Sequence, residues 1–488
     1  MMTWWQSLEV IAWSWVHVLL LVLMLVVHIL TSVHIALNKR EPRSAVTWMV
    51  STWFMPFLGA VLYFWFGVNR LQRKARHLRL HSHHPRYCLP AVTHEVSANH
   101  LNTDFGNLIG IAKAIGSISG FPLVWGNKVE PLQSGEAYFE MLHSIGHAKR
   151  SITLITYIFD DDLTGQEFVA ALSKAVGRGV AVRVLVDDVG AMYSRPTIWK
   201  RLDSARIPRA AFLTRFLPIP FAYWQLRNHR KIMVVDGSMG YTGGMNIRHN
   251  QSGGGDCKFP IQDLHFKVQG PVVSQLQTTF AEDWWFTTRE YLEGEPWYPM
   301  ETQPVGETIA RGIPDGPDED LDNLRLTYLA AIGSASQSIK LVTPYFLPDQ
   351  DISTALSLAA LRGVEVDILI PEQSNLRLVQ WATTPYLLPL IQRGCRIWLT
   401  PPPFDHSKLL LVDGHWTLVG SANWDQRSLR LNFEFNVECY DRNLTRSLDR
   451  MVEKKLFRAT QVTEEKLAQQ SIAVRLRDGL ARMLAPIL

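Results

Sequence analysis

One group of reactive residues occurs twice in this chain of 488 residues, with 177 positions between the copies. Each copy has a histidine, a lysine two positions later and an aspartate at the end of the following apolar run. The copies are His229, Lys231 and Asp236, and His406, Lys408 and Asp413. Each copy continues in step to a small pair and an asparagine, Gly243-Gly244 with Asn246 and Gly420-Ser421 with Asn423. A fixed offset over six positions is hard to obtain by chance, so we expect one active site built from two similar halves.

The runs after the two lysines are apolar and predict strands, in which alternate side chains share a face. Histidine and lysine, two positions apart, therefore point the same way. Asp236 and Asp413 lie an odd number of positions away, just before Gly237 and Gly414. We include both aspartates in the catalytic signature, but in a supporting role, holding the loop or a neighbouring cation.

The small pairs and the asparagines indicate what the cavity binds. Glycine at these positions permits a close backbone approach, and the amides of Asn246 and Asn423 can donate hydrogen bonds to phosphoryl oxygens. Two lysines, two asparagines and two histidines together make a cationic cavity rich in donors. We therefore predict a phosphodiester site, with Asn246, Asn423, Gly244 and Ser421 contacting the phosphate.

Two histidines can also divide the work of covalent catalysis. One, unprotonated, attacks phosphorus, and the other protonates the leaving alkoxide and then deprotonates the incoming hydroxyl. Carboxylates that accept the other ring N–H would fix each tautomer. The candidates are Glu434, which follows His406 by 28 positions, and Asp263, which follows His229 by 34. A structural ion pair is the alternative role for each carboxylate.

No cofactor is expected. The four cysteines, Cys88, Cys257, Cys395 and Cys439, lack metal-ligand spacing, and we find neither a carboxylate cluster for a metal nor a glycine-rich nucleotide loop. Breaking one phosphodiester while making another is nearly balanced in free energy, so neither a nucleotide nor a metal is required.

The order of the predicted elements repeats as well. Each half reads helix, strand, helix, strand, with strands near 151–157 and 178–186 in the first half and near 338–343 and 362–370 in the second. This order predicts an α/β fold of two half-domains related by a pseudo-twofold axis, each with a mostly parallel sheet covered by helices. We place the halves at 136–293 and 323–462, with a connector at 81–135 and a linker rich in Pro, Gly and acidic residues at 294–322.

The first 80 residues predict a membrane anchor. Residues 10–38 and 44–69 contain no charged side chain, and each run exceeds the roughly 20 residues that cross a bilayer. We expect two transmembrane helices, since the first run is too long for a cleaved signal peptide and has no basic residue before it. Five basic residues follow the second run and three lie in the turn, which places both ends, and the catalytic domain, in the cytoplasm.

At the other end of the chain, residues 463–488 form an amphipathic pattern with interleaved arginines. Such a helix packs on the globular domain or lies in the membrane interface, and the sequence leaves both options open.

Taken together, the paired signatures resemble those of the phospholipase D superfamily. The runs 228–237, 241–247 and 343–348, with the turn at 39–43, are similar to those of the membrane-anchored bacterial cardiolipin synthases. This resemblance covers nearly the whole chain. It implies that two phosphatidylglycerol molecules condense to cardiolipin and glycerol through a phosphatidyl-histidine, in the bacterial cell (inner) membrane. His229 is favoured as the nucleophile by analogy alone.

Three other functions share parts of this pattern. A phospholipase D hydrolysing the same lipids needs the same residues and differs in its acceptor. A nuclease of the superfamily would want a basic groove with stacking aromatics, whereas this chain carries a net charge of +4, so nucleic acid is not an expected partner. A non-catalytic membrane scaffold has no reason to keep both sets of residues complete.

Overall fold

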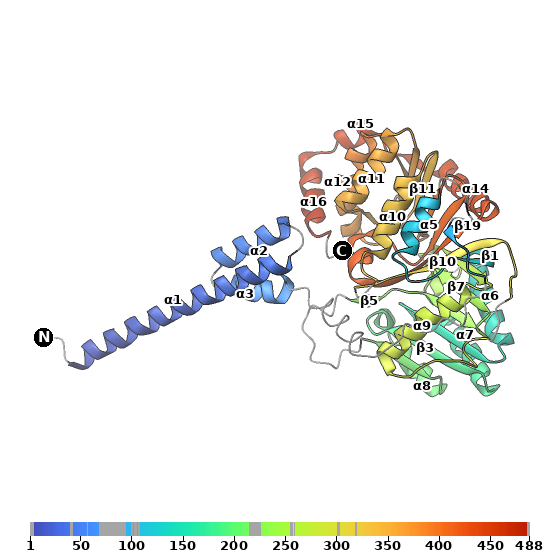
Figure 1. Cartoon of the computed structure of the whole chain (residues 1–488), viewed down its shortest axis with the longest axis horizontal. Coiled ribbons are helices and arrows are strands. Elements are labelled where there is room, and N and C mark those ends of the chain that lie inside the picture. Colours follow the sequence, from blue (N-terminus) through green and yellow to red (C-terminus); the bar gives the residue numbers. More distant parts are fainter. Residues whose placement is uncertain are drawn as a thin grey trace. The chain divides into compact units, whose positions relative to one another are not determined.

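The computed structural model describes residues 4–39, 42–55, 57–67, 94–98, 101, 105, 108–213, 226–253, 257, 259–299, 303–317 and 320–485. These residues belong to two compact units, the N-terminal helices and a larger unit that holds everything after them (Figure 1). Each unit is described by itself.

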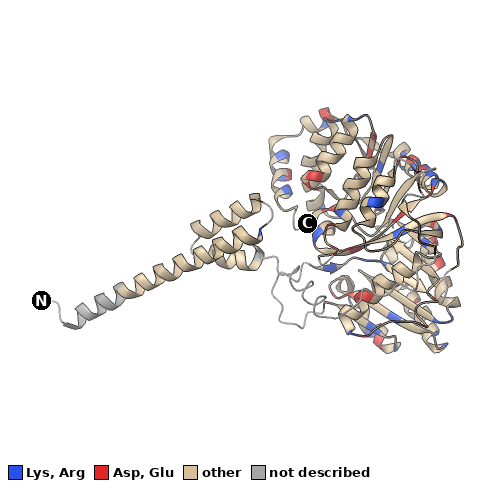
Figure 2. Cartoon of the chain, viewed as in Figure 1, with Lys and Arg blue, Asp and Glu red and all other residues tan. Residues whose placement is uncertain are grey.

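The N-terminal unit begins with a long helix, α1 (Trp4–Asn38). Its segment Trp15–Asn38 has a mean hydropathy of 2.6, and it is the one segment of the described chain that is long and apolar enough to cross a membrane. In Figure 2 the ribbon of Trp15–Asn38 is tan, since this segment has no Lys, Arg, Asp or Glu. The expected second helix at 44–69 is instead divided into α2 (Pro42–Phe54), α3 (Leu58–Leu62) and a π-helical turn, η1 (Tyr63–Gly67). Pro56 falls at the division, and proline interrupts helices because it lacks an N–H.

This unit has two arms, α1 and the segment that contains α2, α3 and η1. The two arms contact each other through polar groups. Trp53 Nε1 donates to Ser32 Oγ at 3.0 Å, and Nδ1 of His34 lies 2.8 Å from the hydroxyl of Tyr63. The second arm therefore folds back along α1.

In the larger unit, two sets of equivalent strands follow each other in the same order from the centre of the sheet to either edge. Two antiparallel strands, β1 (Val124–Gln133) and β10 (Thr308–Asp315), form the centre. From β1 the order is β9, β7, β6, β2, β3, β4, and from β10 it is β19, β17, β16, β11, β13, β14, with β20 (Thr460–Gln461) at the edge. The first set is β2 (Ser151–Thr156), β3 (Ala181–Asp187), β4 (Arg209–Phe212), β6 (Ile232–Val235), β7 (Met239–Gly243) and β9 (Leu264–Gln269). The second set is β11 (Ser338–Val342), β13 (Glu365–Pro371), β14 (Arg396–Thr400), β16 (Leu409–Val412), β17 (Trp416–Gly420) and β19 (Asn432–Tyr440).

The expectation of mostly parallel sheets is wrong. Within each set the pairs on the outer side are parallel, as in β2 with β3 and β3 with β4. The signature strands instead form antiparallel hairpins, β6 with β7 and β16 with β17, and these pair onward with β9 and β19, also antiparallel. The helix–strand alternation predicted the outer pairs correctly, but it does not extend past the signatures, where short turns replace helical crossovers.

The segments expected to be a connector and a linker contribute the two central strands. β1 lies within 81–135 and β10 within 294–322. Neither looks like a strand in the sequence, because β1 contains Gly126 and Pro131 and β10 contains Gly312 and Pro314. Their tertiary neighbours override these weak local preferences.

Helices cover both faces of the sheet. Alternate residues of β6 show the two faces: Ile232 and Val234 join an apolar cluster with α9 and α14, while Met233 and Val235 join a cluster with α6 and α7. On that second side, α5, α10, α11 and α12 cover the second set of strands. The helices are α5 (Ile109–Gly116), α6 (Ser134–His147), α7 (Leu163–Gly177), α8 (Trp199–Ser204), α9 (Val273–Thr288), α10 (Asn323–Ser334), α11 (Gln350–Leu361), α12 (Arg377–Ile391), α13 (Gln426–Arg430), α14 (Arg442–Arg458), α15 (Glu464–Ala468) and α16 (Ile472–Met483).

Each signature aspartate makes a tight turn and ties it to the neighbouring strand. Asp413 and Gly414 have φ of 52° and 67°, and His415 N–H donates to Val412 O at 3.2 Å, as in a type I′ hairpin. The Asp413 carboxylate accepts from the N–H groups of residues 336, 337 and 338 and from the Ser336 hydroxyl. Asp236 (φ 52°) does the same for the N–H groups of residues 149, 150 and 151. These bonds join each hairpin turn to the start of the neighbouring strand, β11 or β2.

We expect Asp413→Ala to lower the stability of the larger unit by about 3 kcal/mol, because several donors lose a charged acceptor and alanine tolerates positive φ poorly. Asp413→Asn keeps one acceptor oxygen and tolerates this backbone conformation, so it should cost clearly less. Thermal unfolding of both variants in detergent, followed by intrinsic fluorescence, measures the difference. A melting temperature of Asp413→Ala equal to that of the unaltered protein would contradict the role.

Candidate active site

The two signature histidines stand on short segments that cross from one set of strands to the other. β5 (Arg227–Asn228) pairs in parallel with the start of β19, and the N–H of His229 donates to Phe433 O at 2.9 Å. In the same way β15 (Phe404–Asp405) pairs with β8 (Ile261–Gln262), and the N–H of His406 donates to Gln262 O at 2.8 Å. Each histidine is thereby placed beside the residue that directly follows its backbone partner, Phe433 or Gln262, in the chain.

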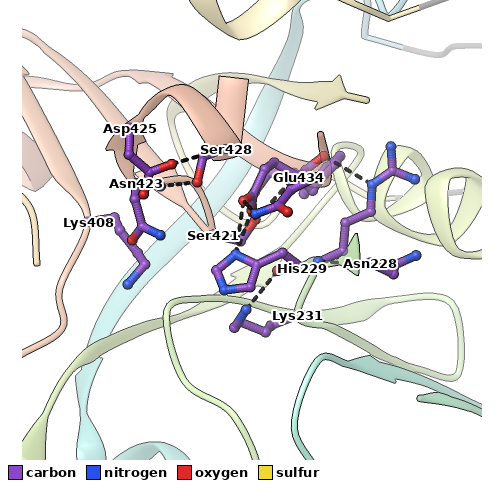
Figure 3. A network of polar contacts seen from close by, with 12 residues as sticks. Asn228, His229, Lys231, Lys408, Ser421, Asn423, Asp425, Ser428 and Glu434 are labelled. Carbon is purple, nitrogen blue, oxygen red and sulfur yellow. Dashed lines mark hydrogen bonds and ion pairs between the residues drawn. The ribbon is translucent and has the colours of Figure 1, made fainter. Parts of the chain in front are cut away.

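Those next residues are the two predicted carboxylates, and the pairing is crossed. His229 Nδ1 lies 2.9 Å and 3.0 Å from the two carboxylate oxygens of Glu434 (Figure 3). His406 Nδ1 lies 2.7 Å from Asp263 Oδ2. All four side chains are buried. With Nδ1–H donating to Glu434, the Nε2 lone pair of His229 is left for chemistry, whereas Nε2 of His406 lies 3.1 Å from Lys408 Nζ.

The small residues of the signatures fit these carboxylates, and they differ between the copies. The Ser421 hydroxyl donates to Glu434 Oε2. At Gly244 a Cβ would lie 2.2 Å from Asp263 Oδ1, so the shorter carboxylate comes close to the backbone instead. Gln251 Nε2 donates to Asp263 Oδ2 at 3.1 Å. Gly244 and Ser421 therefore contact the carboxylates that orient the histidines.

Gly243 and Gly420 are required by the neighbouring strands. They have φ of 145° and 159°. A Cβ on Gly420 would lie 2.4 Å from Phe435 O, and one on Gly243 would lie 2.7 Å from Leu264 O. The close approach expected from the sequence is thus an approach to β19 and β9.

The two lysines are buried and lie at the same site. Lys231 Nζ donates to His229 O at 2.7 Å, and Lys408 Nζ lies 3.0 Å and 3.1 Å from the ring nitrogens of His406. Burial lowers the pKa of Lys231 to about 7, against the effect of Glu434, and Lys408 lowers this pKa further. Burial lowers the pKa of Lys408 to about 8, against the effects of Asp263 and Glu434. Both lysines therefore hold their protons weakly, and a bound anion would stabilise their charged forms.

Both histidines are held neutral at pH 7. Burial lowers the pKa of His229 to about 4, although Glu434 acts the other way, and Lys231 and Lys408 add to the lowering. The pKa of His406 is lowered by burial and by Lys408, and Lys231 contributes. Burial opposes ionisation of Glu434, but His229, Lys231 and Ser421 together hold its pKa below the usual value. The charge of the lysine from the other signature contributes to the pKa of each histidine. The two signatures therefore lie at one site.

The signature asparagines are placed by a repeated contact that the sequence did not suggest. The N–H of Asn246 donates to Gln251 Oε1 at 2.8 Å, and the N–H of Asn423 lies 3.3 Å from Ser428 Oγ, five positions on in both cases. Asn246 Oδ1 accepts from the N–H of Ile158 at 3.1 Å, which orients the amide. In Figure 3, Asn423 lies beside Lys408 and across from His229. Extending the comparison of the two copies by five residues would have found these supports.

Two tyrosines beside the histidines were also missed. The ring of Tyr157 lies 5.2 Å from that of His229, and the ring of Tyr345 lies 6.2 Å from that of His406, each edge to face. Both tyrosines follow the first strand of their set, β2 and β11, whose ends meet the site. Equivalent placement in the repeat was the available signal, but counted from the first residues of β2 and β11, Ser151 and Ser338, Tyr157 aligns with Pro344, one position before Tyr345.

The residues between histidine and lysine hold the crossing segments in place. Arg230 is fully buried and bonds Asp283 Oδ1 at 2.7 Å and Glu434 O at 3.0 Å. In the second copy the charges are exchanged, since Lys455 pairs with Asp405 and lies 3.3 Å from Ser407 Oγ. Arg230 thus links the first signature to the backbone of the carboxylate that orients it.

Within the described residues, no group of three or more His, Cys, Asp or Glu side chains could hold a metal ion. What the arrangement offers is two imidazoles with fixed tautomers, two buried ammonium groups and two amides. Such a site can attack a phosphodiester, stabilise charge on its non-bridging oxygens and protonate a leaving group.

Comparison with known proteins agrees with this site. Residues 141–284 and 328–456 match the family model described as "Cardiolipin synthase, PLD-like domain", and residues 11–67 match "Phospholipase_D-nuclease N-terminal". Cardiolipin synthase of Oceanobacillus iheyensis is 32% identical over 480 residues, 96% of this chain and 99% of that protein. Cardiolipin synthase A of Pseudomonas putida is 30% identical over 467 residues, 94% of this chain and 95% of that protein. Phosphatidylserine synthase of Haemophilus influenzae shares the fold, with a TM-score of 0.60 at 15% identity over 78% of this chain and 100% of that one.

A mixed α/β fold with two histidine–lysine signatures at one site defines the phospholipase D-like class of enzymes. Within that class, the chain belongs to the cardiolipin synthase family with PLD-like domains.

The lysine pKa values predict how anion binding depends on pH. A bound phosphodiester favours the charged form of both ammonium groups and raises their pKa, so binding takes up protons and affinity falls as pH rises through about 7 and 8. We expect the Kd of glycerophosphoglycerol, whose own charge is constant, to rise by about tenfold or more between pH 7 and 9. Calorimetric titration in buffers of different ionisation enthalpy measures both the Kd and the proton uptake.

Lys231→Arg is the control for this effect, because arginine stays charged over the whole range. The variant should show a shallower pH dependence. A Kd independent of pH in the unaltered protein would mean that the two ammonium groups do not bind the phosphate.

Proposed function

We propose that this chain transfers a phosphatidyl group from one phosphatidylglycerol molecule to another, giving cardiolipin and glycerol. The observation that carries the proposal is the crossed pairing of His229 with Glu434 and of His406 with Asp263. It gives one site two oriented imidazoles of the kind that a two-step transfer needs. The names of the relatives and of the family model supply the product, cardiolipin, and phosphatidylglycerol as donor and acceptor is part of the proposal.

In the proposed first step, Nε2 of His229 attacks phosphorus and the bond from phosphorus to the headgroup glycerol breaks. His406, protonated beside the bound anion, donates its proton to the departing alkoxide. In the second step His406 takes the proton of a terminal hydroxyl on a second phosphatidylglycerol, and that oxygen displaces His229 from phosphorus. One phosphodiester is broken and one is made, so no cofactor is proposed.

We propose Lys231, Lys408, Asn246 and Asn423 as the groups that contact the non-bridging oxygens. Glu434 and Asp263 hold the histidine tautomers, and Gly244 and Ser421 act on the phosphate site through these carboxylates. Asp236 and Asp413 support the hairpins, as their bonds to backbone N–H groups suggest.

We further propose two half-domains, about 136–293 and 323–462, related by a pseudo-twofold axis, and an anchor in the bacterial cell (inner) membrane. The matching strand order supports the first proposal. For the anchor, the hydropathy of α1 supports one span, and the contacts of Trp53 and Tyr63 back onto α1 support a second span formed by α2, α3 and η1. The basic residues that follow the anchor favour a cytoplasmic catalytic domain.

Purified full-length protein, given phosphatidylglycerol in detergent with a chelator, should form cardiolipin and glycerol in equal amounts. His229→Ala and His406→Ala should each lower the rate by about 10³-fold or more, since each removes a group that the other cannot replace. His147→Ala, at an exposed histidine of α6, is the matched control and should retain full activity.

Lipid analysis separates the outcomes of this assay. Phosphatidic acid as the sole product would indicate a hydrolase in place of a transferase. Activity that is lost with the chelator would contradict the cofactor-free mechanism, and activity that survives both histidine changes would favour a scaffold role.

The assignment of the nucleophile has its own test. Mass spectrometry of protein quenched at neutral pH during turnover should find an acid-labile phosphatidyl adduct on the peptide that contains His229. Replacement of His406 should slow release of this adduct. An adduct on His406 would exchange the two roles while leaving the two-step mechanism in place.

A further inference from the structure

The last helix, α16 (Ile472–Met483), carries an apolar stripe that nothing in the described chain covers. Its members recur at helical spacing and face outward: Ile472, Leu476, Leu480 and Met483, with Leu484 directly after the last helical residue. They are exposed by between 42% (Leu484) and 82% (Ile472) of their surface. A stripe of this kind on a surface helix marks a contact with another apolar phase.

The opposite face of α16 is already used for packing. Ala481 and Ala485 join a small buried cluster with Val379 and Ala382 of α12. Arg477 lies over the ring of Trp381, 4.7 Å from its centroid, and bonds the buried Asp478. The helix is therefore held on the domain in one rotation, which keeps the stripe exposed.

The charge around the stripe is positive. Arg475, Arg477 and Arg482 are exposed, and the one acidic residue of α16, Asp478, is buried and paired with Arg477 (Figure 2). Apolar residues between exposed arginines match a surface whose interior is apolar and whose headgroups are anionic. A second copy of this chain fits less well, because an isologous pairing would bring equivalent arginines together.

The stripe is close to the active site. Tyr345, whose ring contacts that of His406, packs against the cluster that holds α16. The Tyr345 hydroxyl also donates to Asn375 Oδ1 at 2.8 Å, next to Leu376, which is exposed at the start of α12. The site, the start of α12 and α16 therefore share one edge of the larger unit.

We propose that the stripe of α16 and the exposed start of α12, here called the docking edge, bind the surface of an anionic lipid bilayer. This contact is separate from the N-terminal anchor, and it presents the active site to lipid headgroups. The proposal rests on the proposed function for its purpose, but the contact can be tested without it.

Hydrogen exchange of the full chain, reconstituted in nanodiscs, tests the contact directly. Residues 472–484 should exchange at least threefold more slowly in nanodiscs that contain phosphatidylglycerol than in nanodiscs of phosphatidylcholine alone. Residues 450–458, at the end of α14, which packs on the other face of the sheet, serve as the internal control. Equal exchange in both lipids would overturn the proposal, and so would protection that depends on protein concentration and not on lipid, which would indicate a second copy.

Activity then tests the purpose of the contact. The double variant Leu476→Asn and Leu480→Asn should lower the rate on phosphatidylglycerol vesicles about tenfold and leave the rate on a short-chain phosphatidylglycerol, dissolved below its critical micelle concentration, within twofold. Phe457→Asn, at an exposed residue of α14, is the matched control. Equal loss on both substrates, or no loss on vesicles, would contradict a docking role. If neither the unaltered protein nor any variant makes cardiolipin, the proposed function fails. The exchange experiment still shows whether residues 472–484 contact the bilayer.

Discussion

The interaction on which the site depends is the crossed bond between each histidine and a carboxylate from the other set of strands. His229 is oriented by Glu434 and His406 by Asp263, so neither signature is complete without its opposite. The crossing follows from backbone pairing, since β5 runs beside β19 and β15 beside β8. The paired strands β1 and β10 join the two sets of strands in one continuous sheet, which fixes the position of one set relative to the other. Any movement between the sets would break both histidine pairs together.

Burial sets the chemistry of this site. Two lysines, two histidines and two carboxylates are withdrawn from water within one junction, and desolvation lowers the pKa of Lys231, Lys408 and both histidines. A cluster of this kind costs stability, because the ammonium groups are incompletely compensated. The phosphodiester of the proposed substrate would supply a compensating negative charge. The desolvation that lowers the lysine pKa values would therefore also favour binding of an anion and stabilisation of charge during transfer.

The two copies are similar without being equal. Gly244 with Asp263 is matched by Ser421 with Glu434, and the buried pair Arg230 with Asp283 is matched by the reversed pair Asp405 with Lys455. Both lysines donate to the backbone carbonyl of their own histidine, but Lys408 Nζ also lies 3.0 Å from the His406 ring nitrogen Nδ1. These differences give the two imidazoles unequal surroundings.

The sequence alone identified the candidate catalytic residues, because the spacing of His, Lys, Gly and Asn is a local property that one strand and one turn can express. It also predicted the parallel outer strands and the apolar α1. The central strands β1 and β10 could not be read from it, since glycine and proline obscure them and their pairing involves residues far apart in the chain. Only the tertiary structure decided which carboxylate serves which histidine. Glu434 and Asp263 were both visible as candidates, but the pairing depends on which segments lie side by side across the sheet, and contacts between distant segments leave no periodicity in a sequence.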